Sequence, residues 1–541
     1  MRTKFIVTNA SVLKKKYAGF SAVKAAINVL IAADKKRGID TKLFDVSDAA
    51  TMKNVGGKAV TLPKNPKQNK QAIDAIYASA ATPPDYLMIL GAVDVIPHQD
   101  LENPMLSADD EDAHAWGDLP YACDAPYSKS VADFTSPTRV VGRLPDIDGA
   151  KKDSAYLRKL LKNAAEWKPL PASAYQSYFS VSAKTWEKST KMSVKKTFGS
   201  NANVFVSPVN GPKWTSEQLA PLSHFINCHG ADGRSEFYGE HPKPAAGEER
   251  YPTAHQTLLV RNNIAAGTVA AVECCYGAQL YKPKKTIDPI HGICQEYLHD
   301  DAYGFFGSTT IAYGPADSNG AADVICAAFL RHVLDGSSLG LAALEARRDF
   351  IKAYPVMDPA DLKTIAQFHL LGDPSIHPVA ESAPKTKTKS KSTKAKAKLD
   401  DGNRSRREAI RKQVPKLAAR TTTYGTSVHE ESMDDGRAAA AAAAAMDMTP
   451  TSVKTVTADA PKSGEESPKA LAAGSKTPPR IFVVTGRRAG VDALESVPML
   501  DIKKGGKSDA PPPGKPPGFV VAMVREEADG SMKVFRKLFS K

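Results

Sequence analysis

Short apolar runs alternate with longer amphipathic stretches through the first 380 residues of the chain. The run KFIVTN at the start is typical of a strand, and the stretch after it places Val23, Ile27 and Leu30 on one helical face. A second strand, TKLFDV, completes a strand–helix–strand unit. The nearly continuous apolar run YLMILG, at 86–91, fits a parallel strand that is covered on both faces.

The same alternation continues toward residue 380. It predicts helices over 66–78 and near 290–298, and strands at 139–142, 177–182, 203–207, 224–228, 268–273 and 303–308. Strands that alternate with helices favour a largely parallel sheet with helices on both faces. We therefore expect an α/β fold in two subdomains, which span residues 1–170 and 171–380.

The pattern changes after residue 380. Residues 381–479 contain the Lys-rich run KTKTKSKSTKAKAK and eight consecutive alanines, and a segment of this kind buries too little apolar surface to offset its chain entropy. We expect a disordered linker here, with a short helix near 404–420. Residues 480–541 regain apolar runs, and EADGS between two of them predicts a hairpin in a small β-containing module.

Net charge changes this picture little. The chain carries +14, but residues 385–420 alone hold 14 Lys and Arg against 3 Asp and Glu. The remaining balance argues against a nucleic-acid-binding core and leaves an anionic partner as an option for the linker only. We see no secretion signal and no apolar run long enough to span a membrane, and six scattered cysteines make no disulfide framework. A cytoplasmic protein with reduced thiols is therefore expected.

Two strands end abruptly in residues that could do chemistry. HFINCHGADG, at 224–233, ends in His229 and Gly230, and TVAAVECCYGAQ, at 268–279, ends in Glu273, Cys274 and Cys275. In an open parallel sheet, ligands bind beyond the carboxyl ends of the strands. If these two strands are neighbours, an imidazole and a thiol meet at one edge, which is the arrangement a nucleophilic cysteine requires. The backbone N–H groups of Gly230 and Cys275 are then the candidate donors to an oxyanion.

The same residues allow other interpretations. Cys274 is disfavoured as the nucleophile because adjacent strand residues face opposite sides, so it is expected to point into the core. Cys228 with His229 and Cys274 with Cys275 form two sulfur-containing pairs, but they lack the usual spacing of zinc ligands. We therefore expect no metal and no cofactor. A purely structural histidine and a buried structural cysteine remain the alternative.

A His-Gly pair followed 46 residues later by a cysteine resembles the caspase-like cysteine peptidases, with ECCYG at the position of their nucleophile. Within that group the chain is most similar to the gingipain family (C25), over roughly residues 85–378. The segments that carry the resemblance are YLMILGAVDVIPHQD, CDAPYS, VVGRLPD, GFFGSTTIAYGP, LGLAALEARRDF and FHLLGDPSIHP.

This resemblance implies a caspase-like three-layer sandwich and a cysteine endopeptidase that acts on proteins or peptides. Cys275 would attack the carbonyl carbon, and His229 would serve as base and acid through an acyl-enzyme. Glu273 resembles the acidic residue that lines the P1 pocket of metacaspases, and Asp133 lies near the acidic pocket residue of gingipains. Both imply cleavage after Arg or Lys, with bidentate geometry favouring Arg.

Three further expectations accompany the resemblance. The Lys-rich linker is a candidate for self-cleavage. Calcium is required by some relatives, but nothing in this sequence indicates it. Gingipains carry a secretion signal and a propeptide, and this chain shows neither, so an extracellular role is not implied. The competing function is a catalytically silent caspase-like scaffold, with the basic tail as its interaction element.

Overall fold

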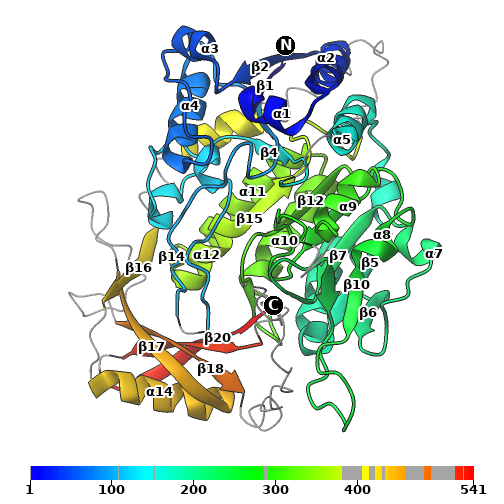
Figure 1. Cartoon of the computed structure of the whole chain (residues 1–541). Coiled ribbons are helices and arrows are strands. Elements are labelled where there is room, and N and C mark those ends of the chain that lie inside the picture. The colour runs from blue at the N-terminus through cyan, green and yellow to red at the C-terminus, as the bar shows by residue number, and fades with distance from the viewer. Residues whose placement is uncertain are drawn as a thin grey trace, which may run out of the picture.

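Helices surround a large central sheet, and a smaller sheet lies at one end of the molecule in the computed structural model (Figure 1). The structure describes residues 2–107, 109–149, 153–284, 290–380, 405–413, 421–428, 433–458, 480–488, 518–527 and 529–541. Within these ranges, no helix combines the length and the apolar character needed to cross a membrane.

The central sheet has ten strands, and every neighbouring pair is parallel except β12 with β15. The sheet therefore consists of two parallel halves that run in opposite directions. The order across it is β2 (Ile39–Asp45), β1 (Arg2–Thr8), β3 (Tyr86–Leu90), β4 (Val141–Leu144), β15 (Phe368–Leu371), β12 (Gly304–Ser308), β11 (Val269–Val272), β7 (Ser223–Asn227), β5 (Tyr178–Ala183) and β6 (Val204–Ser207).

Each parallel half draws most of its strands from one half of the chain. Strands β1 to β4 precede residue 170, and β5, β6, β7, β11 and β12 follow it. Strand β15 is the exception, because it lies late in the chain and yet pairs in parallel with β4. The sheet continues across the expected boundary, so the two expected subdomains share one sheet. The predicted α/β fold with a mostly parallel sheet is confirmed.

The two faces of the sheet are covered by different helices. Alternate residues of β11 show this, because Ala270 and Val272 belong to one hydrophobic cluster with residues of α2, α5 and α9. Val269 and Ala271 belong to a second cluster, with residues of α10, α11 and α12. The helices are α1 (Ala10–Lys16), α2 (Phe20–Lys36), α3 (Ala49–Asn54), α4 (Pro66–Ala78), α5 (Ala155–Glu166), α6 (Glu187–Phe198), α7 (Ser216–Leu219), α8 (Thr257–Val260), α9 (Ile293–His299), α10 (Ala322–Leu334), α11 (Leu339–Ala353), α12 (Pro359–Gln367) and α14 (Met433–Met446).

Local signals explain why several elements begin where the sequence predicted. Helix α4 spans the predicted residues, with Pro66 at its first position and the Asn65 side chain accepting from the Gln68 N–H.

Strand β15 was not among the predicted strands. Its four residues, FHLL, lie directly after α12, because the helix ends at Gln367 and the strand begins at Phe368. No turn residue between them marks the change from helix to strand. Short 3₁₀ helices also occur, namely η1 (Leu119–Ala122), η2 (Val131–Phe134), η3 (Ala172–Tyr175) and η4 (Lys184–Trp186).

A second sheet joins the C-terminal part of the chain to the first part. Its order is β13 (Tyr313–Gly314), β20 (Met532–Ser540), β19 (Val520–Glu526), β18 (Ile481–Arg488), β17 (Met448–Ala458), β16 (Thr422–Val428) and β14 (Val356–Met357). We call β16 to β20 with α14 the C-terminal module. The predicted hairpin is present between β19 and β20, where Gly530 has a φ of 80°.

The expected boundary of this module at residue 480 is wrong, because β16, α14 and β17 lie within 381–479. The alanine run forms α14, since alanine is the strongest helix former, and Ala438 and Ala442 are buried against the module's strands. TSVKTVTA, within β17, has β-branched residues that favour a strand. A helix also occupies residues 405–413. The Lys-rich run lies outside the described residues.

The module packs closely against the central sheet's second hydrophobic cluster. Residues from its strands, and Phe519 directly before β19, belong to the same cluster as those of α10, α11 and α12; the strand residues are Val456, Ile481, Val483, Val521, Met523 and Leu538. In Figure 1 the C-terminus consequently lies inside the molecule, between the module and the strands β7 and β5.

Candidate active site

The two strand ends that carry the expected catalytic residues lie side by side. Strands β7 and β11 are parallel neighbours, with Ile226 opposite Val272. Beyond them the Cys228 N–H donates to the Sγ of Cys274, at 3.3 Å. His229 and Cys275 each follow this contact by one residue. The juxtaposition that the sequence analysis assumed is therefore present at the level of the backbone.

Gly230 has a different reason for lacking a side chain from the one expected. A Cβ built on Gly230 would lie 1.8 Å from the carbonyl oxygen of Cys275, closer than any real contact allows. We expected the bare glycine to let a substrate approach. Instead the glycine lets the two strand ends approach each other.

The imidazole of His229 is buried and held on several sides. Its Nε2 lies 3.2 Å from an Oε2 of Glu240, and its ring lies between Trp186 and Tyr251, at centroid distances of 4.5 and 4.8 Å. Glu240 is itself fixed by the Nη2 of Arg250, at 3.2 Å, and by the hydroxyl of Thr185. His229 forms β8 (His229–Gly230), which pairs with β9 (Glu236–Tyr238), and β9 pairs with β10 (Thr253–Gln256).

The two adjacent cysteines face opposite sides of the sheet, as alternation predicts. Cys274 belongs to the cluster that contains Cys228, and Cys275 belongs to the cluster on the other face. The thiol of Cys275 is fully buried, accepts from the Ala312 N–H at 3.2 Å and lies 3.6 Å from the Ala312 carbonyl oxygen. Burial raises the pKa of Cys275 above its usual value, so the thiol is neutral in this arrangement.

A lysine from the far end of the chain fills a pocket beside Cys275. The ammonium group of Lys541 contacts three side-chain oxygens, at 2.9 Å from Asn227, at 3.0 Å from Asp323 and in a short contact with Glu273. It also lies 5.3 Å from the centre of the Trp186 ring. We call these four residues the lysine pocket.

The main chain of Lys541 is fixed as firmly as its side chain. Its N–H donates to the Ala312 carbonyl at 2.9 Å, and its main-chain oxygen accepts from the Cys275 N–H at 3.0 Å. That N–H is one of the two expected oxyanion donors. Residues immediately before Lys541 pair antiparallel with β13, so that Ser540 lies opposite Tyr313.

The lysine pocket needs a cation. Burial raises the pKa of Glu273 well above its usual value, and Asp323 raises it further. Burial lowers the pKa of Lys541, but the two carboxyl groups outweigh that effect and the net pKa is raised. The ammonium of Lys541 therefore stays charged at neutral pH.

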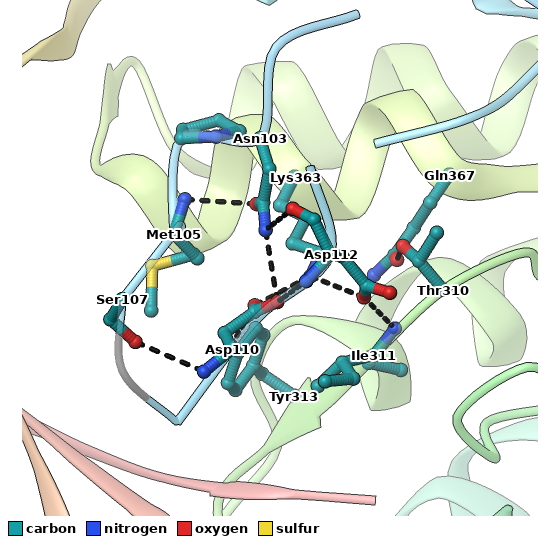
Figure 2. Close-up of polar contacts among 12 residues, drawn as sticks. Asn103, Met105, Ser107, Asp110, Asp112, Thr310, Ile311, Tyr313, Lys363 and Gln367 are labelled. Carbon is teal, nitrogen blue, oxygen red and sulfur yellow. Dashed lines mark hydrogen bonds and ion pairs between the residues drawn. The ribbon is translucent and has the colours of Figure 1, made fainter. Parts of the chain in front are cut away.

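A buried polar cluster supports the segment that runs past Cys275 and Lys541. Figure 2 shows Asp112 accepting from the Ile311 N–H at 2.9 Å, beside Asp110 and Lys363. Asp110 accepts from the Tyr313 hydroxyl and from Lys363, and Asp112 also accepts from the Tyr276 hydroxyl at 2.8 Å. These contacts fix the backbone of 311–313 to the loop that holds the two aspartates.

Part of this site was predictable from the sequence. The predicted residues His229, Cys275 and Glu273 lie here, but the second acidic candidate, Asp133, lies elsewhere. It is on η2, which packs against α12 and β16, and its carboxylate accepts from Ser128 at 2.6 Å. Asp323, in the first turn of α10, is the carboxylate that joins Glu273. Neither Asp323 nor Glu240 stands in a motif, and only their three-dimensional neighbours reveal them.

Among the residues that the structure describes, two groups of side chains away from this site have ligand atoms close enough to hold a metal ion. In the group His98, Asp118 and His369, the Asp118 carboxylate already accepts from two nitrogens of Arg143, at 2.8 and 2.7 Å. The second group is centred on Glu296, which pairs with Arg261 at 2.9 and 3.0 Å. An arginine therefore already occupies the central carboxylate of each group, and neither group includes a residue of the site described above.

The comparison with protein families agrees with the resemblance. The sequence profile of peptidase family C25 matches residues 5–379. No curated protein matches the chain. Among solved structures, one titled "Structure of Protease" is 14% identical, with a TM-score of 0.47, and the match covers 72% of this chain and 81% of that one.

Two further structures are each 10% identical, with a TM-score of 0.44, and each match covers 70% of this chain. One is the Arg-specific cysteine proteinase gingipain R, of which 78% is covered. The other is the complex of the Porphyromonas gingivalis RgpB pro- and mature domains, of which 80% is covered.

Proposed function

This chain belongs to peptidase family C25 and is a cysteine-type peptidase, and from that premise we propose that it cleaves peptide bonds after lysine with Cys275 and His229. One observation carries the proposal. A lysine side chain fills the pocket formed by Asn227, Glu273, Asp323 and Trp186, while its main-chain oxygen accepts from the Cys275 N–H. This is where the carbonyl of a P1 residue would have to lie for attack by Cys275.

The proposed reaction proceeds in two balanced steps. His229 accepts the thiol proton as the Cys275 sulfur attacks the carbonyl carbon, and the same proton passes to the leaving amine as the peptide bond breaks. Water, deprotonated by His229, then attacks the thioester, which releases the new carboxylic acid and restores the thiol. The Ala312 N–H, 3.2 Å from the sulfur, stabilises the thiolate, and Glu240 orients the imidazole.

The pocket supports lysine over arginine. An ammonium group has three N–H donors, and the pocket presents three oxygens from three different side chains. A guanidinium is planar and larger, and it prefers two oxygens in one plane. Gly314 also contributes, because a Cβ there would lie 2.0 Å from the Cε of Lys541 and would close the space for the aliphatic stem. The sequence-based preference for arginine is therefore replaced by a proposed preference for lysine.

A peptide library tests this proposal. Wild type and Cys275→Ala are incubated with peptides that vary only at P1, and the cleaved bonds are identified by mass spectrometry. We expect cleavage after Lys, weaker cleavage after Arg, and none with Cys275→Ala. Preferred cleavage after acidic or large apolar residues would refute the P1 assignment.

Self-processing is a separate part of the proposal. The Lys-rich run between residues 385 and 398 offers many lysines of the proposed P1 type. N-terminal sequencing of fragments from purified wild type, with Cys275→Ala as the control, would show cleavage in this run. A silent scaffold is the competing function, and the failure of both wild type and Lys541→Ala to react with a lysyl thiol-directed probe would favour it.

A further inference from the structure

We propose that Lys541 and the strand before it act as an intramolecular inhibitor that occupies the substrate site of this chain. The proposal rests on the proposed peptidase function and adds a mode of regulation to it. The observation behind it is that the pocket, the backbone pairing and the Cys275 N–H are all engaged at once by one segment of the chain itself.

The backbone contacts exclude a second peptide. An extended substrate whose P1 residue bonds with Ala312 would also have to pair with β13, because β13 is the strand that continues from Ala312. Both positions are taken, since the Lys541 N–H already donates to Ala312 and β20 already pairs with Tyr313 and Gly314. Substrate and tail are therefore mutually exclusive.

The side-chain contacts exclude a second basic residue. Lys541 is fully buried, and all three of its N–H donors have an oxygen within 3.0 Å. A second cation in the same pocket would share two carboxyl groups with the first, at the cost of burying an unpaired charge.

The C-terminal module holds the occupant in place from outside the pocket. On β20, Arg536 pairs with Asp361 at 2.7 Å and with Asp358, both on or next to the first turn of α12. Leu538 on the same strand is buried in the cluster that contains α10 to α12. Directly before β19, the ring of Phe519 lies against the ring of Tyr313, with 5.9 Å between the ring centroids. These contacts set the register in which Lys541 enters the pocket.

The module also covers His229. The pocket beside the imidazole is lined by Trp186, Glu240 and Tyr251 and also by Phe519, Phe539 and Ser540, which lie at the start of β19 and the end of β20. His229 is only 2% exposed. The proposed general base is therefore covered in part by the same segment that fills the lysine pocket.

Tethering makes such an occupant effective even when its own affinity is modest. A group on a short linker has an effective concentration on the order of 1 mM. If the Kd of the free tail peptide is about a tenth of that concentration, only about one enzyme molecule in eleven has an empty substrate site. Removing the tail would then raise the apparent kcat/KM about tenfold.

The test compares Lys541→Ala, Lys541→Gln and wild type on a fluorogenic peptide with Lys at P1. Lys537→Ala is the matched control, because Lys537 is an exposed lysine on the same strand. We expect kcat/KM to rise at least tenfold in both Lys541 variants and to stay within twofold of wild type in the control. Lys541 variants that remain within twofold of wild type would overturn the proposal and leave the peptidase assignment intact.

A binding experiment separates this proposal from the peptidase function. In the Cys275→Ala background, calorimetry measures binding of the acetylated peptide LFSK, the sequence of residues 538–541. We expect binding at least tenfold tighter when Lys541→Ala is also present. Equal affinity overturns the inhibitor. If the peptide binds more tightly in this experiment, but neither wild type nor the Lys541 variants hydrolyse the fluorogenic peptide, the occupied site is supported and the peptidase activity is refuted. Arg536→Ala, which leaves the pocket intact, provides a second route to release if the Lys541 variants fold poorly.

Discussion

The Cα of Gly230 lies so close to the carbonyl oxygen of Cys275 that a methyl group on it would stand 1.8 Å from that oxygen. This contact joins the ends of the two strands that carry His229 and Cys275, and it leaves no room for any side chain. The distance between the two catalytic candidates therefore depends on one missing methyl group.

Gly230→Ala is accordingly expected to abolish peptidase activity, because the backbone of β8 must move away from Cys275. Overpacking of this kind also destabilises the fold by about 1–3 kcal/mol. Activity and thermal unfolding check the two effects separately. Gly436→Ala is the control, since nothing lies within 4 Å of its added Cβ on helix α14, and it should be neutral or slightly stabilising.

The two adjacent cysteines should respond differently to replacement. Cys275→Ala is expected to lower kcat by at least about 10³-fold, because the nucleophile is lost. Cys274→Ala should retain most of the activity, since its sulfur faces the other side of the sheet, where it accepts from the Cys228 N–H. Steady-state kinetics on a lysyl peptide measure both, and a reversal of the two results would move the nucleophile to Cys274.

The pKa of Cys275 gives a pH dependence with a definite sign. Burial raises this pKa, so the thiol of wild type stays protonated at neutral pH and its alkylation by iodoacetamide should keep rising beyond pH 9. Lys541→Ala readmits water to the site and should make alkylation at pH 7.5 at least tenfold faster.

Peptide mass spectrometry measures the alkylation rate of each cysteine separately, and the other cysteines serve as internal controls. Burial raises the pKa of Cys123 and of Cys294 to about 12, so both should react slowly in either protein. Equal rates at Cys275 in wild type and Lys541→Ala would contradict the expectation.

Glu240 is expected to act as a positioning residue for His229. Glu240→Gln keeps the size of the side chain but removes the charge beside Nε2, so we expect kcat to fall on the order of 10²-fold with little change in KM. Glu236→Gln, on the adjacent strand β9, is the control and should behave as wild type. A fall in stability with unchanged kcat would assign Glu240 a structural role only.

The two acidic candidates for the P1 pocket can be separated by substitution. In the Lys541→Ala background, where the tail no longer competes for the pocket, Asp323→Asn removes a charged contact to the lysine ammonium of the substrate, which is worth about 1.5–3 kcal/mol, and should lower kcat/KM for lysyl peptides by roughly 10- to 150-fold. Asp133→Asn should have no effect, because Asp133 lies on η2. A comparable loss in Asp133→Asn would restore the sequence-based assignment.

Local patterns were sufficient for the elements and insufficient for their long-range partners. Strand β11 and the residues after it could be read from one apolar run that stops at Glu273, and alternation correctly separated Cys274 from Cys275. The contacts of Asp323 and Lys541 could not be read in this way. They lie 50 and 268 residues from Glu273, and only the packing of α10 and β20 brings them to the same pocket.

The prediction of a disordered linker over residues 381–479 was wrong for part of the C-terminal module for a related reason. The alanine run of α14 has almost no side-chain volume of its own, and it folds because the strands β18 and β19 provide the apolar surface against which Ala438 and Ala442 pack. The composition of the segment indicates how much apolar surface it can bury by itself. It does not indicate how much surface the segment buries against the strands of the folded module.

Strand β15 has a consequence for how this protein can be divided. Because β15 crosses to the first half of the sheet, a fragment cut near residue 170 would lose the neighbour of β4 and expose that strand along one side. Such a fragment should self-associate rather than stay monomeric. We therefore expect neither half, when expressed alone, to be obtained as a stable monomer.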